Sequence, residues 1–283
     1  MAETKETTTQ AQWDAMNPAS KDNLLRVIRD EAERMFKLAE VPENWEKPTA
    51  SGHWQVRDIV GHMVDVTEGY LDAFRIARTG ETAEAPVGLL AMAQRLDERA
   101  QALRSVPQAE LMRRLREDYA QMMTVFEGLS AEDWTGLMVP HGYMGPVPAF
   151  FYPTFHLVDY GVHGWDIREG LGMTTGLSGD TADFLAPIMF ILWQATTVPG
   201  RIGSEPLRAG IRVSGRNAGT WHVTVSDSGY AYERVADDSP DLPVMFEFDP
   251  GSLVLTAYGR INGGTAYGDA AFADRYRGLF HSI

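Results

Sequence analysis

The sequence predicts an α+β protein in which an all-helical bundle is followed by a small α+β domain. Up to about residue 172, apolar residues recur with the helical period of about 3.6 in long amphipathic segments. After Pro199-Gly200 the pattern alternates with a period of two, which is typical of strands. With 44% hydrophobic and 23% charged residues among 283, the composition is that of a globular protein with an ample core.

The net charge and the cysteine count exclude several functions. A formal charge of -14 argues against nucleic acid and anionic membrane surfaces as partners. Because the chain has no cysteine, it cannot form disulfides, supply thiolate ligands or use a cysteine nucleophile, so any catalytic thiol must come from outside. No apolar run approaches the roughly 18 residues of a membrane-spanning helix.

Three segments are expected along the chain: a disordered tail at 1–16, the helical bundle at 17–175 and the α+β domain at 180–283. The polar, Thr-rich start, residues 1–12, lacks the apolar core of a secretory signal. We therefore expect a cytoplasmic protein.

Helices of the bundle are expected at 17–41, 56–78, 89–103, 109–129 and about 147–170. Asn17-Pro18 is a suitable cap and first-turn pair for the first of them. Pro107 separates the third from the fourth, because proline disfavours helix before it. Ser130-Ala131-Glu132-Asp133 is typical of another helix cap. The Gly- and Pro-rich residues 136–148 are expected to form a loop that leads into the last helix.

The second domain is expected to begin with one apolar helix at 180–196. Strands are predicted at 209–213, 219–225, 230–235 and 244–248, followed by helices at 250–259 and 269–280. Ser226-Asp227-Ser228-Gly229 indicates a hairpin turn between the second and third strands.

The last helix of the bundle carries a polar stripe, His156, Asp159, His163 and Asp166, at steps of three, four and three residues. The intervening residues are large and apolar, so the helix is expected to be buried all round. Unsatisfied polar groups are costly there. Two imidazoles and two carboxylates would suit a divalent metal. Two buried, hydrogen-bonded His–Asp pairs explain the stripe equally well.

His62, between Val60 and Met63 in the second helix, points inward or nearly so. A single inward histidine is more often a hydrogen-bonded core residue than a metal ligand. Asp58 and Asp65 lie one turn to either side and are candidate partners. Facing helices of a bundle are nevertheless a common place to assemble a metal site.

Two segments resemble the signatures of a known family. Trp54-Gln55-Val56-Arg57-Asp58-Ile59-Val60-Gly61-His62 is similar to its first signature, and Asp159 with His163-Gly164-Trp165-Asp166 is similar to its second. The family is that of the mycothiol-dependent maleylpyruvate isomerases, which have a DinB-like four-helix bundle followed by a small sterol-carrier-like domain. The segment from Asp249 to Asp269 resembles that second domain, so the resemblance covers most of the chain.

The resemblance implies a zinc-type site with an open position, formed by His62, Asp159 and His163 around a divalent metal. The family has a glutamate where this chain has Asp159, whose side chain is one methylene shorter. His156, one turn earlier, is therefore a candidate substitute ligand, or a hydrogen-bond partner of Asp159.

The resemblance also implies an enzyme that uses mycothiol or a similar low-molecular-weight thiol on a small, carboxylated, unsaturated substrate. A metal lowers the pKa of a bound thiol, whose thiolate could add to the double bond. Rotation and elimination would give the other isomer, and addition alone would be thiol transfer. Asp166 would orient His163, and Arg260, which matches a family arginine, would bind the substrate carboxylate. A solvated surface arginine is the alternative for Arg260.

The other histidines, His53, His141, His222 and His281, are expected to be surface or structural residues, although His141 lies in a loop that could border the site. The same architecture could also serve a metal-free binding protein, or a cyclase or isomerase of a specialised pathway. The shortened Asp159 and the additional His156 favour that alternative. A pure interaction protein has little support, because no exposed helical face is apolar.

Overall fold

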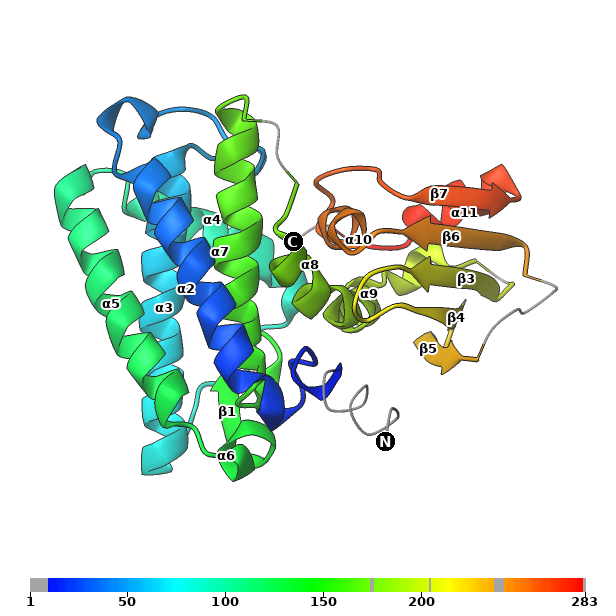
Figure 1. Ribbon diagram of the computed structural model, residues 1–283, viewed down its shortest axis with the longest axis horizontal. Coiled ribbons are helices and arrows are strands. Elements are labelled where there is room, and N and C mark those ends of the chain that lie inside the picture. The colour runs from blue at the N-terminus through cyan, green and yellow to red at the C-terminus, as the bar shows by residue number, and fades with distance from the viewer. Residues whose placement is uncertain (1–9, 174–175, 204, 237–241, 282–283) are drawn as a thin grey trace. The chain divides into compact units, whose positions relative to one another are not determined.

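The structure, a computed structural model, describes residues 10–173, 176–203, 205–236 and 242–281. The chain divides into two compact units, Met1–Leu177 and Ser178–Ile283. The first is helical and the second contains a five-stranded sheet, so the expected fold class is confirmed (Figure 1).

Long helices form the body of the first unit. They are α2 (Lys21–Ala39), α3 (Val56–Thr79), α5 (Gln108–Gly128) and α7 (Phe151–Gly170), with the shorter α4 (Met92–Ala102) packed on α3. α2 packs against α7 and α3 against α5, so buried apolar residues of all four meet in the interior (Figure 1). Asn17 caps the start of the first helical segment as expected, through the 3-10 turn Pro18–Ser20 that leads into α2. The Asn17 side chain accepts a hydrogen bond from the backbone of Ala19, and Gly80, at φ 72°, ends α3 in the left-handed conformation.

A short β-hairpin lies where only a loop was predicted. After α6 (Ala131–Gly136), which Ser130 caps as expected, β1 (Met138–His141) pairs antiparallel with β2 (Gly145–Pro148). The prolines in both segments argued against strands in the sequence, since proline cannot donate a hydrogen bond between strands. They are tolerated because a two-stranded ribbon consists of edge strands. Gly145, at φ 82°, supplies the turn conformation that other residues rarely adopt.

The second unit is a sheet covered by helices. Its strands are β3 (Leu207–Val213), β4 (Gly219–Ser226), β5 (Gly229–Val235), β6 (Val244–Phe248) and β7 (Thr265–Gly268), in the order β5-β4-β3-β6-β7. β3 and β6 are parallel, and the other pairs are antiparallel. Its helices are α8 (Gly179–Leu185), α9 (Met189–Thr196), α10 (Pro250–Ala257) and α11 (Ala270–Arg277). Phe190 of α9 stacks on Trp221 at 4.8 Å, and Tyr276 of α11 contacts Phe246 at 5.1 Å.

Two predictions for this unit were wrong. The single helix expected at 180–196 is divided by a 3-10 turn, Ala186–Ile188, because Pro187 has no N–H group and its ring clashes with the preceding helical turn. The final helix ends at Arg277 rather than at residue 280, where Phe280 forms a β-bridge with Thr197. The short β7, with mostly exposed residues, lacks the alternating pattern by which strands are predicted, and it was missed.

The first nine residues of the expected tail lie outside the described residues. Within 10–16, Ala15 is buried, and its carbonyl accepts a hydrogen bond from Trp134 Nε1 at 2.9 Å. The packed structure therefore already includes Ala15, and the prediction of a tail that extends to residue 16 was wrong at this end.

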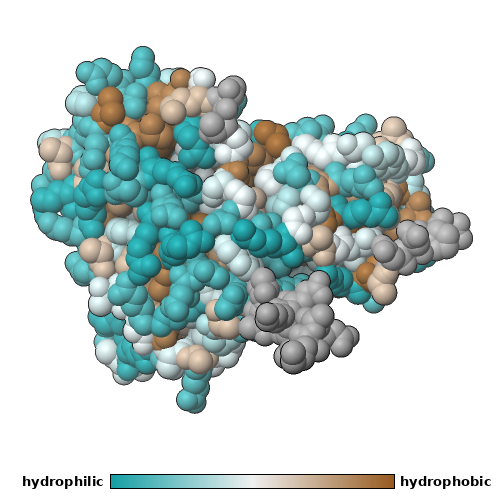
Figure 2. Space-filling model, viewed as in Figure 1, coloured by the Kyte–Doolittle hydropathy of each residue, from teal (hydrophilic) through white to brown (hydrophobic). Residues whose placement is uncertain are grey.

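On the face shown in Figure 2, hydrophilic residues predominate and hydrophobic ones occur in small groups. None of the described helices combines the length and the apolar character needed to cross a membrane.

Gly170 provides a test of how closely the chain packs against the end of α7. A Cβ atom at this position would lie 2.1 Å from the Pro48 carbonyl oxygen. We expect Gly170→Ala to lower the free energy of unfolding by about 1–3 kcal/mol, because the loop must move away. In the control Gly69→Ala, also within a helix, the new methyl group meets nothing within 4 Å, so stability should rise by about 0.5–1 kcal/mol. Urea denaturation measures both, and an undiminished stability of Gly170→Ala would contradict the close approach.

Candidate metal centre

Two facing helices bring together the three residues that the sequence proposed as ligands. His62 comes from α3, and Asp159 and His163 come from successive turns of α7. One ligand atom from each lies within 4.8 Å of the others. His62 Nε2 is 3.9 Å from Asp159 Oδ1, and the two imidazole centroids are 5.0 Å apart. His62 and Asp159 are buried and His163 is half-buried, so the group lies at the edge of the bundle core.

Asp166 holds the ring of His163. Its Oδ2 is 2.9 Å from His163 Nδ1, and its side chain is fully buried. A neutral imidazole paired in this way carries its proton on Nδ1, which leaves the Nε2 lone pair for another partner. The backbone carbonyl of Asp166 also accepts a hydrogen bond from Ala50, which ties the loop before α3 to the same turn of α7.

Tyr70, which the sequence analysis did not single out, contacts the acidic member of the group. Its hydroxyl donates to Asp159 Oδ2 at 3.3 Å, while Asp159 Oδ1 faces His62. The two carboxylate oxygens thus have different neighbours. Tyr70 lies two helical turns after His62 on α3, so a search for polar residues near the His62 side of that helix would have found it.

His156 does not take either of the positions expected for it. It is fully buried, and neither ring nitrogen has a hydrogen-bond partner within the described structure, so the predicted bond to Asp159 was wrong. Its ring lies among aromatic side chains, stacked on Tyr119 of α5 at 6.0 Å and 4.9 Å from Tyr160. A step of three residues turns a helical position by about 60°, so His156 turns toward α5 while Asp159 turns toward α3. Burial lowers the pKa of His156 to about 4.

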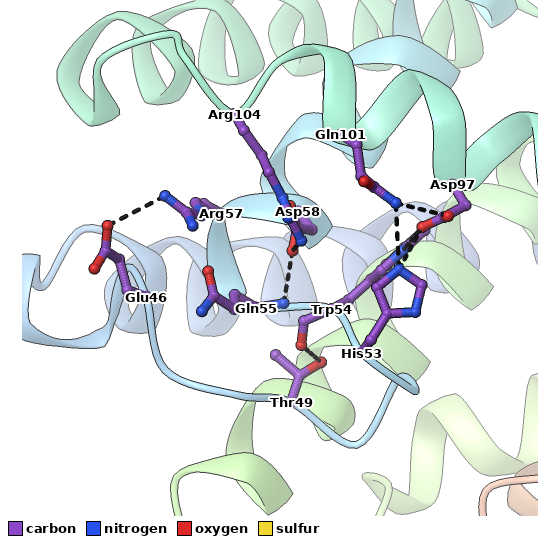
Figure 3. Close-up of polar contacts among 10 residues, drawn as sticks. All are labelled: Glu46, Thr49, His53, Trp54, Gln55, Arg57, Asp58, Asp97, Gln101 and Arg104. Carbon is purple, nitrogen blue, oxygen red and sulfur yellow. Dashed lines mark hydrogen bonds and ion pairs between the residues drawn. The ribbon is translucent and has the colours of Figure 1, made fainter.

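The carboxylates proposed as partners of His62 bind arginines instead. Asp58 accepts from Arg104 at 2.5 and 2.6 Å and from the backbone of Gln55 at the start of α3 (Figure 3). Asp65 pairs with Arg99 at 3.4 Å. Among the described residues, His62 Nδ1 is buried without a hydrogen-bond partner. The interpretation of His62 as a histidine paired with either carboxylate was therefore wrong.

Trp54, two residues before the first residue of α3, covers both histidines. Its ring centroid lies 5.1 Å from that of His62 and 5.8 Å from that of His163. The side chain is 9% exposed. An indole in this position shields the two imidazoles from water on one side.

The remaining candidates have structural surroundings. His141 Nδ1 accepts from the backbones of Tyr143 and Met144, both at 3.3 Å, and burial lowers its pKa to about 4. His281 lies 2.9 Å from the carbonyl of Thr196. Arg260 belongs to the second unit, where its half-buried side chain donates to the carbonyl of Tyr258 at 2.9 Å.

His53 and His222 differ in exposure. His53 is exposed and lies 2.8 Å from Asp97. His222, on β4, is half-buried, and its Nε2 atom is buried without a hydrogen-bond partner among the described residues.

Comparison with known proteins gives the family. The model of the mycothiol maleylpyruvate isomerase N-terminal domain matches residues 25–168, which include most of α2 and run through to α7. The chain belongs to this family. No curated protein sequence matches the chain.

Two solved structures share the fold. A crystal structure of the mycothiol-dependent maleylpyruvate isomerase is 15% identical, with a TM-score of 0.59. A variant of that enzyme with one histidine replaced by alanine is 14% identical, with a TM-score of 0.58. In both comparisons the match covers 88% of this chain and 94% of the other.

The buried histidines predict a specific pH dependence of stability. Burial lowers the pKa values of His141 and His156 from 6.5 to about 4. Between these values the unfolded chain binds protons that the folded protein does not. The free energy of unfolding should therefore fall on acidification from about pH 6.5 to 4, by up to about 1.4 kcal/mol per pH unit for each histidine.

Replacement of His156 alone isolates its contribution to the pH dependence of the free energy of unfolding. His156→Phe removes a titrating group but keeps an aromatic ring, so the slope of unfolding free energy against pH should decrease by up to that amount. Urea denaturation at several pH values in the window measures the slope. An unchanged slope would mean that His156 titrates normally in the folded protein.

Proposed function

We propose that this chain is a metal-dependent enzyme that uses a low-molecular-weight thiol, mycothiol or a similar compound, on a small unsaturated carboxylated substrate. The reaction is a cis–trans isomerisation or a transfer of the thiol. Membership of the mycothiol maleylpyruvate isomerase family supports this class of activity. The absence of cysteine supports an external thiol. With a net charge of -14, we propose small-molecule partners and no nucleic acid.

The observation that carries the metal hypothesis is the convergence of two imidazole nitrogens and one carboxylate oxygen. The 3.9 Å between His62 Nε2 and Asp159 Oδ1 is too long for a hydrogen bond. Donors around a tetrahedral ion with bonds of about 2.1 Å lie about 3.4 Å apart, so a small closing motion would let one ion satisfy these groups. The donor set fits zinc, and it also suits other divalent ions.

Asp159 fits the proposed ligand role despite its short side chain. The Tyr70 hydroxyl occupies Oδ2, and Oδ1 is directed to His62. The ring of His163 is oriented by a different partner. Asp166 holds Nδ1 of His163, so Nε2 is the nitrogen available for the ion.

When bound, a divalent ion would supply the Lewis acidity that lowers the pKa of a thiol or water at its open position. The chain itself would contribute a shielded site, because Trp54 covers both histidines. For the second unit, we propose that Arg260 binds the substrate carboxylate, as the match to the family arginine implies. Replacement of Arg260 by alanine should then raise KM for a carboxylated substrate much more than it lowers kcat.

The ligands are tested by replacing each histidine. His62→Ala and His163→Ala should each abolish stoichiometric zinc binding and thiol-dependent turnover of maleylpyruvate, since two remaining ligands hold the ion poorly. His222→Ala, which removes a histidine of the second unit, should retain both properties. Elemental analysis of purified protein and an isomerisation assay with and without mycothiol provide the readouts.

The same measurements separate the proposal from its alternative, a metal-free binding protein or a cyclase or isomerase of a specialised pathway. If the wild-type protein carries no divalent metal, and added zinc, nickel, iron or cobalt leaves its thermal stability unchanged, the metal-dependent function is rejected.

Asp166 is tested through its effect on metal affinity. In Asp166→Asn the amide can still hydrogen-bond, but the negative charge that strengthens His163 as a ligand is lost. We expect zinc affinity to fall by about 10–100-fold. Competition with a chelator of known affinity measures the change. An unaltered affinity would show that the His163–Asp166 pair serves only the packing of α7.

A further inference from the structure

Asp97, on α4, determines where the Trp54 indole lies. Trp54 Nε1 donates to Asp97 Oδ1 at 2.7 Å (Figure 3). The indole in turn contacts His62 and His163. Trp54 is 9% exposed, and without Asp97 its N–H group would lose the side-chain acceptor that fixes the indole in this orientation.

Asp97 is itself held in place by two further side chains. Its Oδ2 accepts from Gln101 at 2.7 Å, and its Oδ1 lies 2.8 Å from His53 Nε2 (Figure 3). Partial burial tends to raise the pKa of Asp97, but the hydrogen bonds from Trp54, Gln101 and His53 outweigh it and the pKa is lowered. The residue is thus a charged acceptor with three donors around it, and its geometry is strongly determined.

The loop that carries Trp54 is attached to α7 on its other side. Ala50 donates to the backbone carbonyl of Asp166 at 3.0 Å, and the Thr49 hydroxyl donates to the carbonyl of Trp54 at 2.8 Å. The loop is therefore bound to α7 through Ala50 and to α4 through the Trp54 indole. Such a span allows α4 to influence the ligands without contacting them.

The packing of α4 on α3 depends on the residue next to His62. A Cβ atom at Gly61 would lie 3.1 Å from the carbonyl oxygen of Ala100, so a larger residue would press the two helices apart. At the end of the same contact, Arg104 binds Asp58, which caps the start of α3. Both contacts follow Asp97 in the chain, and they hold the C-terminal part of α4 close to the turn of α3 that carries His62.

We propose that Asp97 is a positioning residue for the metal centre, which acts by holding the Trp54 indole against the rings of His62 and His163. The indole restricts the rotamers of both ligands, and this preorganisation raises metal affinity. The inference rests on the proposed function, because it presupposes that these histidines bind an ion.

The experiment measures zinc affinity of the full-length protein by chelator competition. Asp97→Ala should bind zinc about 10–100-fold more weakly than the wild type, the range typical of residues that orient a ligand. Asp97→Asn keeps an oxygen acceptor for the indole and should stay within a few-fold of the wild type. Glu98→Ala removes the next carboxylate of α4, which pairs with Gln94, and should bind zinc as the wild type does.

Trp54→Phe provides a second approach that does not depend on the folding of Asp97→Ala. It keeps an aromatic ring but removes the donor to Asp97, and zinc affinity should fall in the same range. Combining it with Asp97→Ala should weaken binding no further, because both changes remove the same interaction. The absorption spectrum of the cobalt-substituted protein should also change in both single variants, which a defect confined to distant packing would not cause.

The outcomes separate this inference from the proposed function. If the wild-type protein binds zinc but Asp97→Ala and Trp54→Phe bind it equally well, the positioning role is rejected and the metal site stands. Additive losses in the double variant would also overturn it, since the two residues would then act independently. If the wild-type protein binds neither zinc nor nickel, iron or cobalt, the proposed function fails, and the positioning role fails with it.

Discussion

The first unit depends on a helix that is buried along most of its length and still carries the polar stripe of His156, Asp159, His163 and Asp166. Buried polar groups usually require hydrogen-bond partners, and the four members of this stripe differ in the partners they have. Asp166 pairs with His163, and Asp159 shares its oxygens between Tyr70 and the His62 side. His156 has no such partner, and burial lowers its pKa so that the ring stays neutral. One ligand atom each from His62, Asp159 and His163 converges at the candidate metal centre.

Besides the direct packing of α3 and α7 on their neighbouring helices, a loop connects this group to the rest of the bundle. Residues 48–55 run past the end of α7, where Gly170 allows close approach, and end at Trp54 against α4. In this arrangement the Trp54 indole packs against the rings of both His62 and His163. It is also the route by which we propose that Asp97, outside the ligand set, positions the ligands. A bundle held only by apolar contacts would tolerate small shifts of α4 more easily.

The second unit has a core of its own, in which α9 and α11 pack aromatic side chains against one face of the sheet. The chemistry proposed for the chain combines a metal-ligand set on helices with a thiol that the cysteine-free chain cannot supply. Ligand side chains that neighbouring residues already hold in the binding orientation need less reorganisation when the ion binds, which favours metal affinity. The hydrogen bonds of Asp166 and Tyr70 are of this kind.

Periodicity in the sequence was sufficient to predict α3 almost residue for residue, the buried character of α7, and the alternating strands β3 to β6, because these features depend on which residues are apolar and how they are spaced. The motifs in α3 and α7 were sufficient to propose His62, Asp159 and His163, which the structure brings together. Only tertiary structure decided the partners. Asp58 binds Arg104, which follows α4, rather than His62, and His156 turns toward Tyr119 rather than Asp159. Helical spacing gives the direction of a side chain to within a face, whereas hydrogen bonds require the position of the neighbouring helix to within a fraction of an ångström.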